Sequence, residues 1–155
     1  MPKVAINGIR HSSKVVQRYL SYELPDGGRV KLPLVNVRIR HNDRSFTTIG
    51  LIDSGATQTF IPRGLSELLY LSSLGPDKVS TAGGDVVYQL SRIDELSLLF
   101  HSNATATFSD VSVEFPSQGI DDLPYVVLGR NYVFDSFRIC FDEAEKRTTF
   151  KRALS

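Results

Sequence analysis

The sequence has little of what disulfides and metal sites require. It contains one cysteine, Cys140, and three widely separated histidines, His11, His41 and His101. A single cysteine excludes an intrachain disulfide, and scattered histidines do not form a metal-binding motif. Cys140 lies in the apolar run 137–141, and no base is suggested nearby, so we expect a buried core residue rather than a catalytic thiol.

The sequence also lacks an excess of charge and any long apolar run. Its formal net charge is +1, which gives no electrostatic reason to expect binding to nucleic acid or to a membrane surface. No apolar run approaches the length that crosses a bilayer, and residues 1–5 lack the apolar core of a signal peptide. We therefore expect a cytoplasmic protein without nucleic-acid or membrane partners, either complete or a domain of a longer chain.

The composition is that of a globular domain, and the patterning indicates strands. At 155 residues with 41% hydrophobic and 23% charged residues, one domain with a buried core is expected. Short apolar segments alternate with turn signals, without a repeat or a low-complexity segment, which favours an all-β fold, closed or sandwich-like. The expected strands are 14–24 (with a helix as the alternative), 30–40, 45–52, two or more within 79–100, 104–115, 125–128, 137–142 and 147–151.

Other segments are expected to be helical or irregular. Residues 62–71 predict one short helix with Leu65, Leu68 and Leu69 on one face, and 132–137 predict one or two helical turns. Residues 1 to about 13 are weakly patterned and are expected to form a loose arm. The turn signals are 25–28, 41–44 and 82–85. In the strand 30–40 the alternation slips between Leu34 and Val35, which indicates a bend or bulge.

The stretch Leu51–Thr57 stands out because a polar turn is bracketed by apolar residues. Leu51 and Ile52 lead directly into Asp53, and Ser54 and Gly55 follow as turn residues. A carboxylate at the end of a buried strand costs several kcal/mol unless it is hydrogen-bonded or shares a proton. Such a conflict is typical of a functional site, although a plain surface turn is the alternative.

A second stretch completes a recognisable pattern. Val126-Val127-Leu128-Gly129-Arg130-Asn131 follows later in the chain, and the apolar segment 137–141 comes after it. Together with Leu51–Thr57 and the glycine hairpin 82–85 between them, this order resembles the retropepsins, the single-domain aspartic proteases of retroviral type. The resemblance covers roughly residues 30–142. It implies a retropepsin-like closed β fold with one or two short helices.

The resemblance also implies a chemistry that needs no metal and no cofactor. In aspartic proteases two carboxylates bracket one water, which attacks the peptide bond while the pair shares a proton. This chain supplies one aspartate of the required type, Asp53. The resemblance therefore implies a two-fold homodimer in which each protomer contributes Asp53 to one site that hydrolyses a peptide or protein substrate.

Residue roles follow from the matching positions. Asp53 would be the catalytic carboxylate, and Gly55 and Thr57 would contact substrate. The full set of expected site residues comprises Asp53, the supporting Ser54, Gly55, Ala56 and Thr57, the hairpin tip Ala82, Gly83, Gly84 and Asp85, and the structural brace Gly129, Arg130 and Asn131. Tyr88 could line the hairpin, although packing in the core or on a strand face is the more ordinary role.

One departure from the family concerns Arg130. Retroviral enzymes usually carry an aspartate at the position of Thr57, and it pairs with the arginine equivalent to Arg130. Here Arg130 has no such partner, so we expect it to bind other groups, such as backbone carbonyls. The expected organisation is an N-terminal arm and first strand at 1–28, the protease domain at 29–145 and a C-terminal strand or tail at 146–155 in the dimer interface.

Two other functions compete with the protease. A retropepsin-like dimerisation or peptide-binding module with weak or no activity is favoured by the missing carboxylate at Thr57 and opposed by the intact Asp53-Ser54-Gly55. A small β-barrel that binds a ligand or nucleic acid is opposed by the near-neutral charge and by the lack of a basic, aromatic patch.

Overall fold

The computed structural model describes residues 3–10 and 13–153, and within them the chain is mostly strand. The strands are β1 (Val4–Asn7), β2 (Lys14–Arg18), β3 (Leu20–Glu23), β4 (Arg29–Leu32), β5 (Leu34–His41), β6 (Arg44–Ile52), β7 (Thr59–Phe60), β8 (Gly75–Thr81), β9 (Gly84–Leu99), β10 (Thr105–Pro116), β11 (Val126–Leu128), β12 (Phe137–Asp142) and β13 (Arg147–Arg152). The helical elements are α1 (Arg63–Leu68) and the kinked segment η1 (Arg130–Phe134). This confirms the all-β class with short helices.

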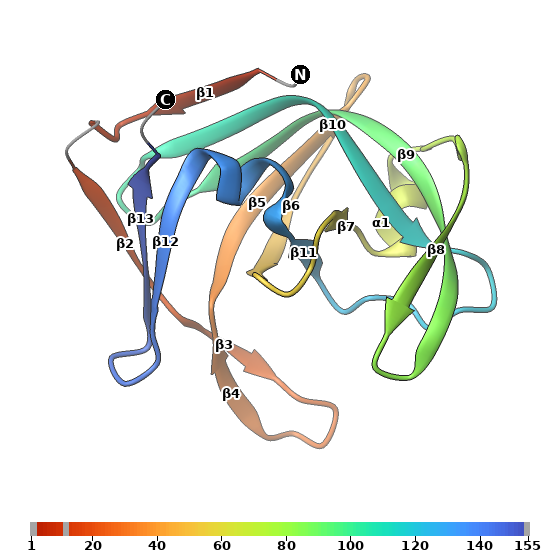
Figure 1. The fold of residues 1–155 in the computed structure, drawn as a ribbon, viewed down its shortest axis with the longest axis horizontal. Coiled ribbons are helices and arrows are strands. Elements are labelled where there is room, and N and C mark those ends of the chain that lie inside the picture. The colour runs from red at the N-terminus through yellow and green to blue at the C-terminus, as the bar shows by residue number, and fades with distance from the viewer. Residues whose placement is uncertain (1–2, 11–12, 154–155) are drawn as a thin grey trace.

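The main sheet closes on itself. Its strand order is β1-β10-β7-β11-β6-β5-β9-β8. An additional pairing between β9 and β10 closes the six strands from β10 to β9 into a ring. Figure 1 shows the long, curved β9 and β10 arching over the other strands. Closure leaves β1 and β8 as the edges of this sheet. The core fills the interior with apolar side chains from β5, β9 and β10, such as Val37, Leu98 and Phe108.

A smaller sheet packs beside the closed one. Its order is β12-β13-β2, and β3 pairs with β4 as a separate hairpin that projects from the molecule (Figure 1). Phe137 and Phe150 from the small sheet pack edge-on against Phe100, which follows β9, with ring centroids 5.0–6.1 Å apart. This aromatic cluster connects the two sheets, because edge-to-face pairs add to the free energy gained by burial.

The hairpins largely agree with the sequence. The slip between Leu34 and Val35 corresponds to a break at Pro33, which separates β4 from β5 and leaves both residues buried. Proline has no N–H for a strand ladder, so it is a natural place for that break. The turn 25–28 joins β3 to β4, the turn 41–44 joins β5 to β6, and the turn 82–85 overlaps the β8–β9 connection.

The N-terminal expectations were partly wrong. Residues 4–7 are not a loose arm but strand β1, which pairs with β10 from Val4 opposite Phe108 to Asn7 opposite Thr105. The remaining arm residues 1–2 and 11–12 lie outside the described residues. The expected strand 14–24 is instead two strands, β2 and β3, which are separated by the buried Tyr19. The amide of Tyr19 donates to the carbonyl of Lys146 at 2.8 Å.

Two expectations about burial were also wrong. Cys140 is exposed rather than in the core. It alternates with Phe137 and Ile139 along β12, so its side chain lies on the opposite face of that strand from the buried aromatic cluster. Leu65 in α1 and Leu69 directly after it are buried, but Leu68 is 52% exposed, because the helix is only six residues long and presents a narrower apolar face than 62–71 suggested.

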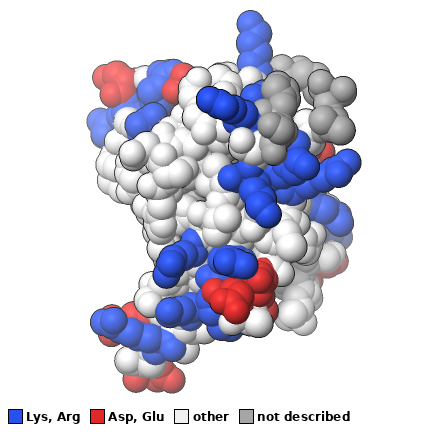
Figure 2. Space-filling model, turned by 90° about the vertical axis from the view of Figure 1, so that its left-hand side faces the viewer, with Lys and Arg blue, Asp and Glu red and all other residues white. Residues whose placement is uncertain are grey.

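The charged side chains are unevenly distributed over the surface. Figure 2 shows the face that carries the left-hand side of Figure 1, where basic side chains predominate over acidic ones. A shallow hollow of about 230 Å³ between the small sheet and β4 is lined by Arg18, Lys31, Lys146 and Arg147, with Glu145 as its acidic residue. Among the described residues no helix combines the length and apolarity needed to cross a membrane.

Candidate active site

Strand β6 carries Asp53 into the middle of the closed sheet. It lies between β5 and β11, and its end pairs in parallel with β11, Ile52 opposite Leu128. The Asp53 amide then donates to the Leu128 carbonyl at 3.0 Å. The chain enters the Asp53 turn from a strand that is hydrogen-bonded on both sides, so the position of this carboxylate is fixed by the sheet.

The turn itself holds the Asp53 carboxylate. The Gly55 amide donates to Asp53 Oδ1 at 2.8 Å, and the Ala56 amide donates to the Asp53 carbonyl at 3.3 Å. A Cβ added at Gly55 would lie 3.1 Å from Asp53 Oδ1, tighter than ordinary van der Waals contact. Asp53 is half-buried, and Ser54, Gly55 and Thr57 are exposed. The carboxylate is therefore oriented by a backbone donor and open to an incoming group.

The second matching stretch passes directly beneath this turn. A Cβ added at Gly129 would lie 2.1 Å from the Gln58 carbonyl oxygen and 2.8 Å from that of Ala56, which only glycine avoids. The amide of Arg130 donates to the Ala56 carbonyl at 2.8 Å, and the amide of Asn131 donates to the Thr57 carbonyl at 3.1 Å. Two backbone hydrogen bonds thus connect the start of η1 to the Asp53 turn.

Side chains contribute to this connection in an unexpected way. Asn131 Nδ2 donates to Gln58 Oε1 at 2.8 Å, a neutral amide pair one residue beyond Thr57. Arg130 is exposed, and its side chain makes no hydrogen bond or ion pair with the residues that the structure describes. Arg130 therefore contacts the turn through its backbone, and the side-chain link between this segment and the turn is the Asn131–Gln58 pair.

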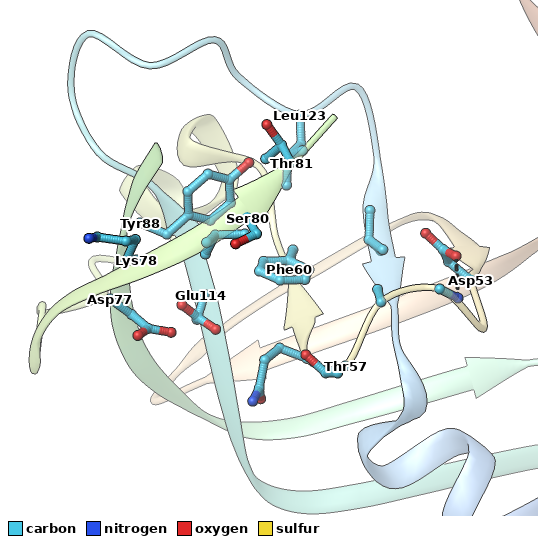
Figure 3. A pocket seen from close by; sticks show the side chains of 15 residues that line it. Asp53, Thr57, Phe60, Asp77, Lys78, Ser80, Thr81, Tyr88, Glu114 and Leu123 are labelled. Carbon is cyan, nitrogen blue, oxygen red and sulfur yellow. Dashed lines mark hydrogen bonds between the residues drawn. The ribbon is translucent and has the colours of Figure 1, made fainter. Parts of the chain in front are cut away.

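A pocket of about 530 Å³ opens beside Asp53. Its lining comes from the Asp53 turn, β7, β8, the start of β9, the end of β10 and the loop before β11, and consists of Asp53, Gly55, Ala56, Thr57, Gln58, Phe60, Asp77, Lys78, Val79, Ser80, Thr81, Tyr88, Glu114, Leu123 and Val127. Figure 3 shows Asp53 at one end, Asp77 and Glu114 at the other, and Phe60 between them. The pocket therefore has a carboxylate at each end and an apolar middle.

The tip of the glycine hairpin lies outside the lining of this pocket. The expected tip residues Ala82, Gly83, Gly84 and Asp85 join β8 to β9, and they do not line the pocket, whereas Asp77 to Thr81 of β8 do. The tip is held by its own side chains: Thr81 Oγ1 donates to the Gly84 carbonyl at 2.6 Å, and Ser80 Oγ donates to Asp85 Oδ1 at 2.9 Å. In this conformation β8, not the tip, faces Asp53 across the pocket.

Tyr88 combines the two roles that the sequence left open. It is buried, and its ring packs edge-on against Phe60 at 5.5 Å while it also lines the pocket. Burial, together with the nearby charges of Asp122 and Glu114, raises the pKa of the Tyr88 phenol above its ordinary value. The phenol therefore stays protonated and can donate a hydrogen bond.

Sequence reasoning missed Glu114. This residue of β10 is 2% exposed, lines the pocket, and neither of its carboxylate oxygens has a hydrogen-bond partner among the described residues. Burial, and then the neighbouring Asp77 carboxyl group, raise the pKa of Glu114 to about 7. The available signal was an acidic residue between Val113 and Phe115 in a strand that is otherwise apolar at that end.

A loop on the far side of the pocket is held to α1 by Asp122. Its carboxylate accepts hydrogen bonds from the amides of Arg63 (2.6 Å), Leu123 (2.8 Å) and Gly64 (3.3 Å). Burial alone would raise the pKa of Asp122, but these backbone donors and the Arg63 charge outweigh it, so the pKa is lowered. Arg63 Nη1 donates to the carbonyls of Ser117 and Ile120 in the same loop. The loop places Leu123 in the pocket wall.

Comparisons with known proteins agree with this architecture. The aspartyl protease family profile matches residues 35–132, which contain both the Asp53 turn and the Gly129-Arg130-Asn131 stretch. The fold is similar to the crystal structure of a retropepsin-like aspartic protease from Rickettsia conorii, with a TM-score of 0.52 and 11% sequence identity over 100% of this chain and 98% of that one. A search of curated proteins found no match.

The family profile spans more than half of the chain, and the solved structure has the same retropepsin-like fold over its whole length. The chain therefore belongs to the aspartyl protease family.

Proposed function

We propose that the protein is a homodimeric aspartic endopeptidase that hydrolyses peptide bonds with a water held between two Asp53 carboxylates, one from each protomer. One observation carries the proposal: a single Asp53, oriented by the Gly55 amide, stands at an exposed turn and lines a pocket of about 530 Å³. Such a pocket accommodates an extended peptide, and the oriented carboxylate is half of the two-carboxylate pair that this chemistry requires.

The division of labour between the carboxylates follows from their proximity in a dimer. Two carboxylates that share a site cannot both be ionised, so the pair holds one proton. The ionised member takes a proton from the water as its oxygen attacks the scissile carbonyl carbon. The protonated member donates to the carbonyl oxygen. Gly55, which carries no side chain, leaves room for the peptide backbone next to the attacking water.

The edges of the small sheet offer a route to the dimer. The C-terminal strand β13 is paired on both sides within the chain, with β12 and with β2. In the described residues β12 and β2 each keep one edge without a strand partner. Free edges pair readily with another chain. We infer that β13 supports the interface from the middle of this sheet, and that β12 or β2 meets the partner.

The test is the dependence of activity on protein concentration. Hydrolysis of an internally quenched peptide pool is measured while the protein is diluted to below its dimer dissociation constant, which sedimentation velocity determines in parallel. Because only dimers hold both carboxylates, the rate should fall with the square of concentration in the dilute range. A rate that stays linear where the protein is monomeric would refute a shared site. A stable dimer with no hydrolysis of any peptide would favour a binding module instead.

A further inference from the structure

The end of the pocket opposite Asp53 contains a carboxylate that the proposed chemistry does not use. Glu114 is buried, its two oxygens have no hydrogen-bond partner among the described residues, and it faces the pocket beside Asp77 (Figure 3). An unsatisfied buried polar group costs roughly 1–3 kcal/mol, and more when it is charged. Retaining a glutamate here without a partner is unfavourable for the free protein.

Asp77 relieves this cost only when a proton is present. Two ionised carboxylates are both acceptors, so Glu114 and Asp77 can form a hydrogen bond only if one of them is protonated. Burial of Glu114, and then its nearness to the Asp77 carboxyl group, raise the pKa of Glu114 to about 7. Near neutral pH Glu114 in the free protein therefore alternates between a protonated and an ionised form, and neither form satisfies every acceptor.

The remaining surroundings supply no permanent cation. Lys78 lines the pocket, but in Figure 3 its amine points away from the Asp77 and Glu114 carboxylates, and it forms no ion pair among the described residues. The neighbours Phe60 and Tyr88 present ring surfaces, which pack against the apolar stem of a long side chain. Aromatic rings also attract a cation placed over their faces.

Two features together, an acidic end and aromatic walls, match one class of substrate side chain. We propose that Glu114 and Asp77 form a specificity subsite that takes an arginine or lysine side chain of the peptide substrate. A guanidinium offers several donors to both carboxylates at once, and its charge replaces the proton that Glu114 otherwise needs. This inference rests on the proposed peptide-bond hydrolysis for its substrate class, and the binding it describes does not require turnover.

Access to Glu114 is through β8. Asp77 is exposed on this strand, which is an edge of the main sheet and is hydrogen-bonded to β9 alone among the described strands. Its side chain can turn toward solvent and back over an incoming cation. A divalent metal is a poorer occupant, because hard cations take six or more oxygen ligands. Among the described residues there is no group of three or more acidic, histidine or cysteine side chains that could hold a metal.

Binding of matched peptides tests the subsite. The Asp53→Asn protein, which cannot turn substrate over, is titrated with fluorescein-labelled octapeptide pools that carry arginine at one fixed position, or citrulline at the same position. Citrulline keeps the shape of arginine without its charge. At one position arginine should bind about ten- to hundredfold tighter than citrulline, as expected for hydrogen bonds to charged groups.

Substitutions then locate the preference. Adding Glu114→Gln should remove the arginine preference, and Asp77→Asn, at an exposed position that tolerates change, should reduce it severalfold. Asp43→Asn removes the same charge from the exposed β5–β6 turn, outside the pocket lining, and should leave the preference intact. Circular dichroism verifies that each variant is folded.

Three outcomes would decide the inference. Equal affinity for arginine and citrulline pools at every position would overturn it, even if the wild-type protein cleaves peptides. A preference that survives Glu114→Gln would overturn the assignment to this residue. A preference that depends on Glu114 in a protein that cleaves no peptide would support the subsite while the proposed protease activity fails.

Discussion

Asp53 and Glu114 are two carboxylates in the wall of one pocket, and they differ in burial and in hydrogen bonding. Asp53 is half-buried, accepts a hydrogen bond from the Gly55 amide and stands on a turn that the sheet fixes. Glu114 is fully buried in the middle of a strand ladder, between Leu90 of β9 and Phe60 of β7, and receives no donor among the described residues.

Under the proposed function, this difference corresponds to a catalytic role for Asp53 and a role in substrate recognition for Glu114. A carboxylate that must exchange protons with a substrate and with its symmetry mate has to be reachable and held in a defined orientation. A carboxylate that waits for a counter-charge can be buried, because burial strengthens the eventual ion pair and penalises neutral occupants. Substitutions at one end of the pocket at a time, or in the segments that hold that end in place, separate these two roles.

The largest effect is expected for the rate of hydrolysis when Asp53 is replaced. Asp53→Asn keeps the shape of the turn but removes the ionisable group, so hydrolysis should fall by at least about 1,000-fold with little change in thermal stability. The measurement is the rate on a quenched peptide pool beside a melting curve. Asp43→Asn, the charge-matched control at an exposed turn, should retain the wild-type rate. Substantial hydrolysis by the Asp53→Asn protein would contradict the proposed function.

The second effect concerns the support of the Asp53 turn. Gly129→Ala places a methyl group where the Gln58 and Ala56 carbonyl oxygens lie, so the turn and η1 must separate. We expect a loss of about 3 kcal/mol in the free energy of unfolding, measured by urea denaturation.

A glycine without this constraint provides the control for Gly129→Ala. A Cβ added at Gly64, in α1, meets only the far end of the Asp122 side chain at 3.8 Å. Gly64→Ala should leave stability unchanged or raise it slightly, because alanine has the higher helix propensity. Equal effects of the two substitutions would show that the close approach at Gly129 does not constrain the fold.

The sequence pattern that pointed to Asp53 also pointed to Gly129, where the chain passes beneath the Asp53 turn. Both positions could be predicted because each depends on local residue types at fixed places in the chain. The strand at 137–142 and the hairpin turns were likewise readable, since alternation and turn residues are local signals. What alternation cannot supply is the partner of each strand. The pairing of β1 with β10, about a hundred residues away, left no local trace, and residues 4–7 therefore looked like a loose arm.

Burial of individual side chains was the least readable property. Cys140 and Glu114 both lie in apolar segments of the sequence, yet the cysteine faces outward and the glutamate faces inward. Their orientations depend on which face of β12 or β10 meets another element, and this is decided by the tertiary packing. The Asn131–Gln58 pair was missed for a similar reason, because Gln58 lies outside the matching motif and amide pairs have no sequence signature.

Burial of Glu114 should make the free energy of unfolding depend on pH. The folded-state pKa of Glu114 is about 7, above the ordinary value of 4.5, so the folded protein holds the proton more tightly than the unfolded chain does. The contribution of Glu114 is therefore most favourable at low pH and is lost as the pH rises from about 5 through 7. Glu114→Gln, which never ionises, should escape this loss.

Melting curves between pH 5 and pH 8 measure this difference. Glu114→Gln should be similar to wild type at pH 5 and more stable by several degrees at pH 8, which corresponds to about 2 kcal/mol. Asp77→Asn should give part of the same gain, because it removes the charge that opposes ionisation of Glu114. Parallel pH profiles for the wild-type and Glu114→Gln proteins would show that this carboxylate is not ionising in a buried setting.

The smallest effect is expected at the loop that places Leu123 in the pocket wall. Asp122 accepts three backbone amides at the start of α1 and next to Leu123, and an asparagine would lose the charge and one acceptor. Asp122→Asn should cost about 1 kcal/mol at pH 7, as for other helix caps.

Because the folded-state pKa of Asp122 is lowered, this stabilisation is present above the ordinary aspartate range and disappears as the pH falls below it. Urea midpoints of the two proteins should therefore differ at pH 7 and come closer together at a pH below the ordinary aspartate range, whereas Asp121→Asn, at the exposed neighbouring position, should match wild type at both. A constant difference at both pH values would mean that the asparagine disturbs the packing of the loop, and the hydrogen bonds to the ionised carboxylate would then not be what holds Leu123 in the pocket wall.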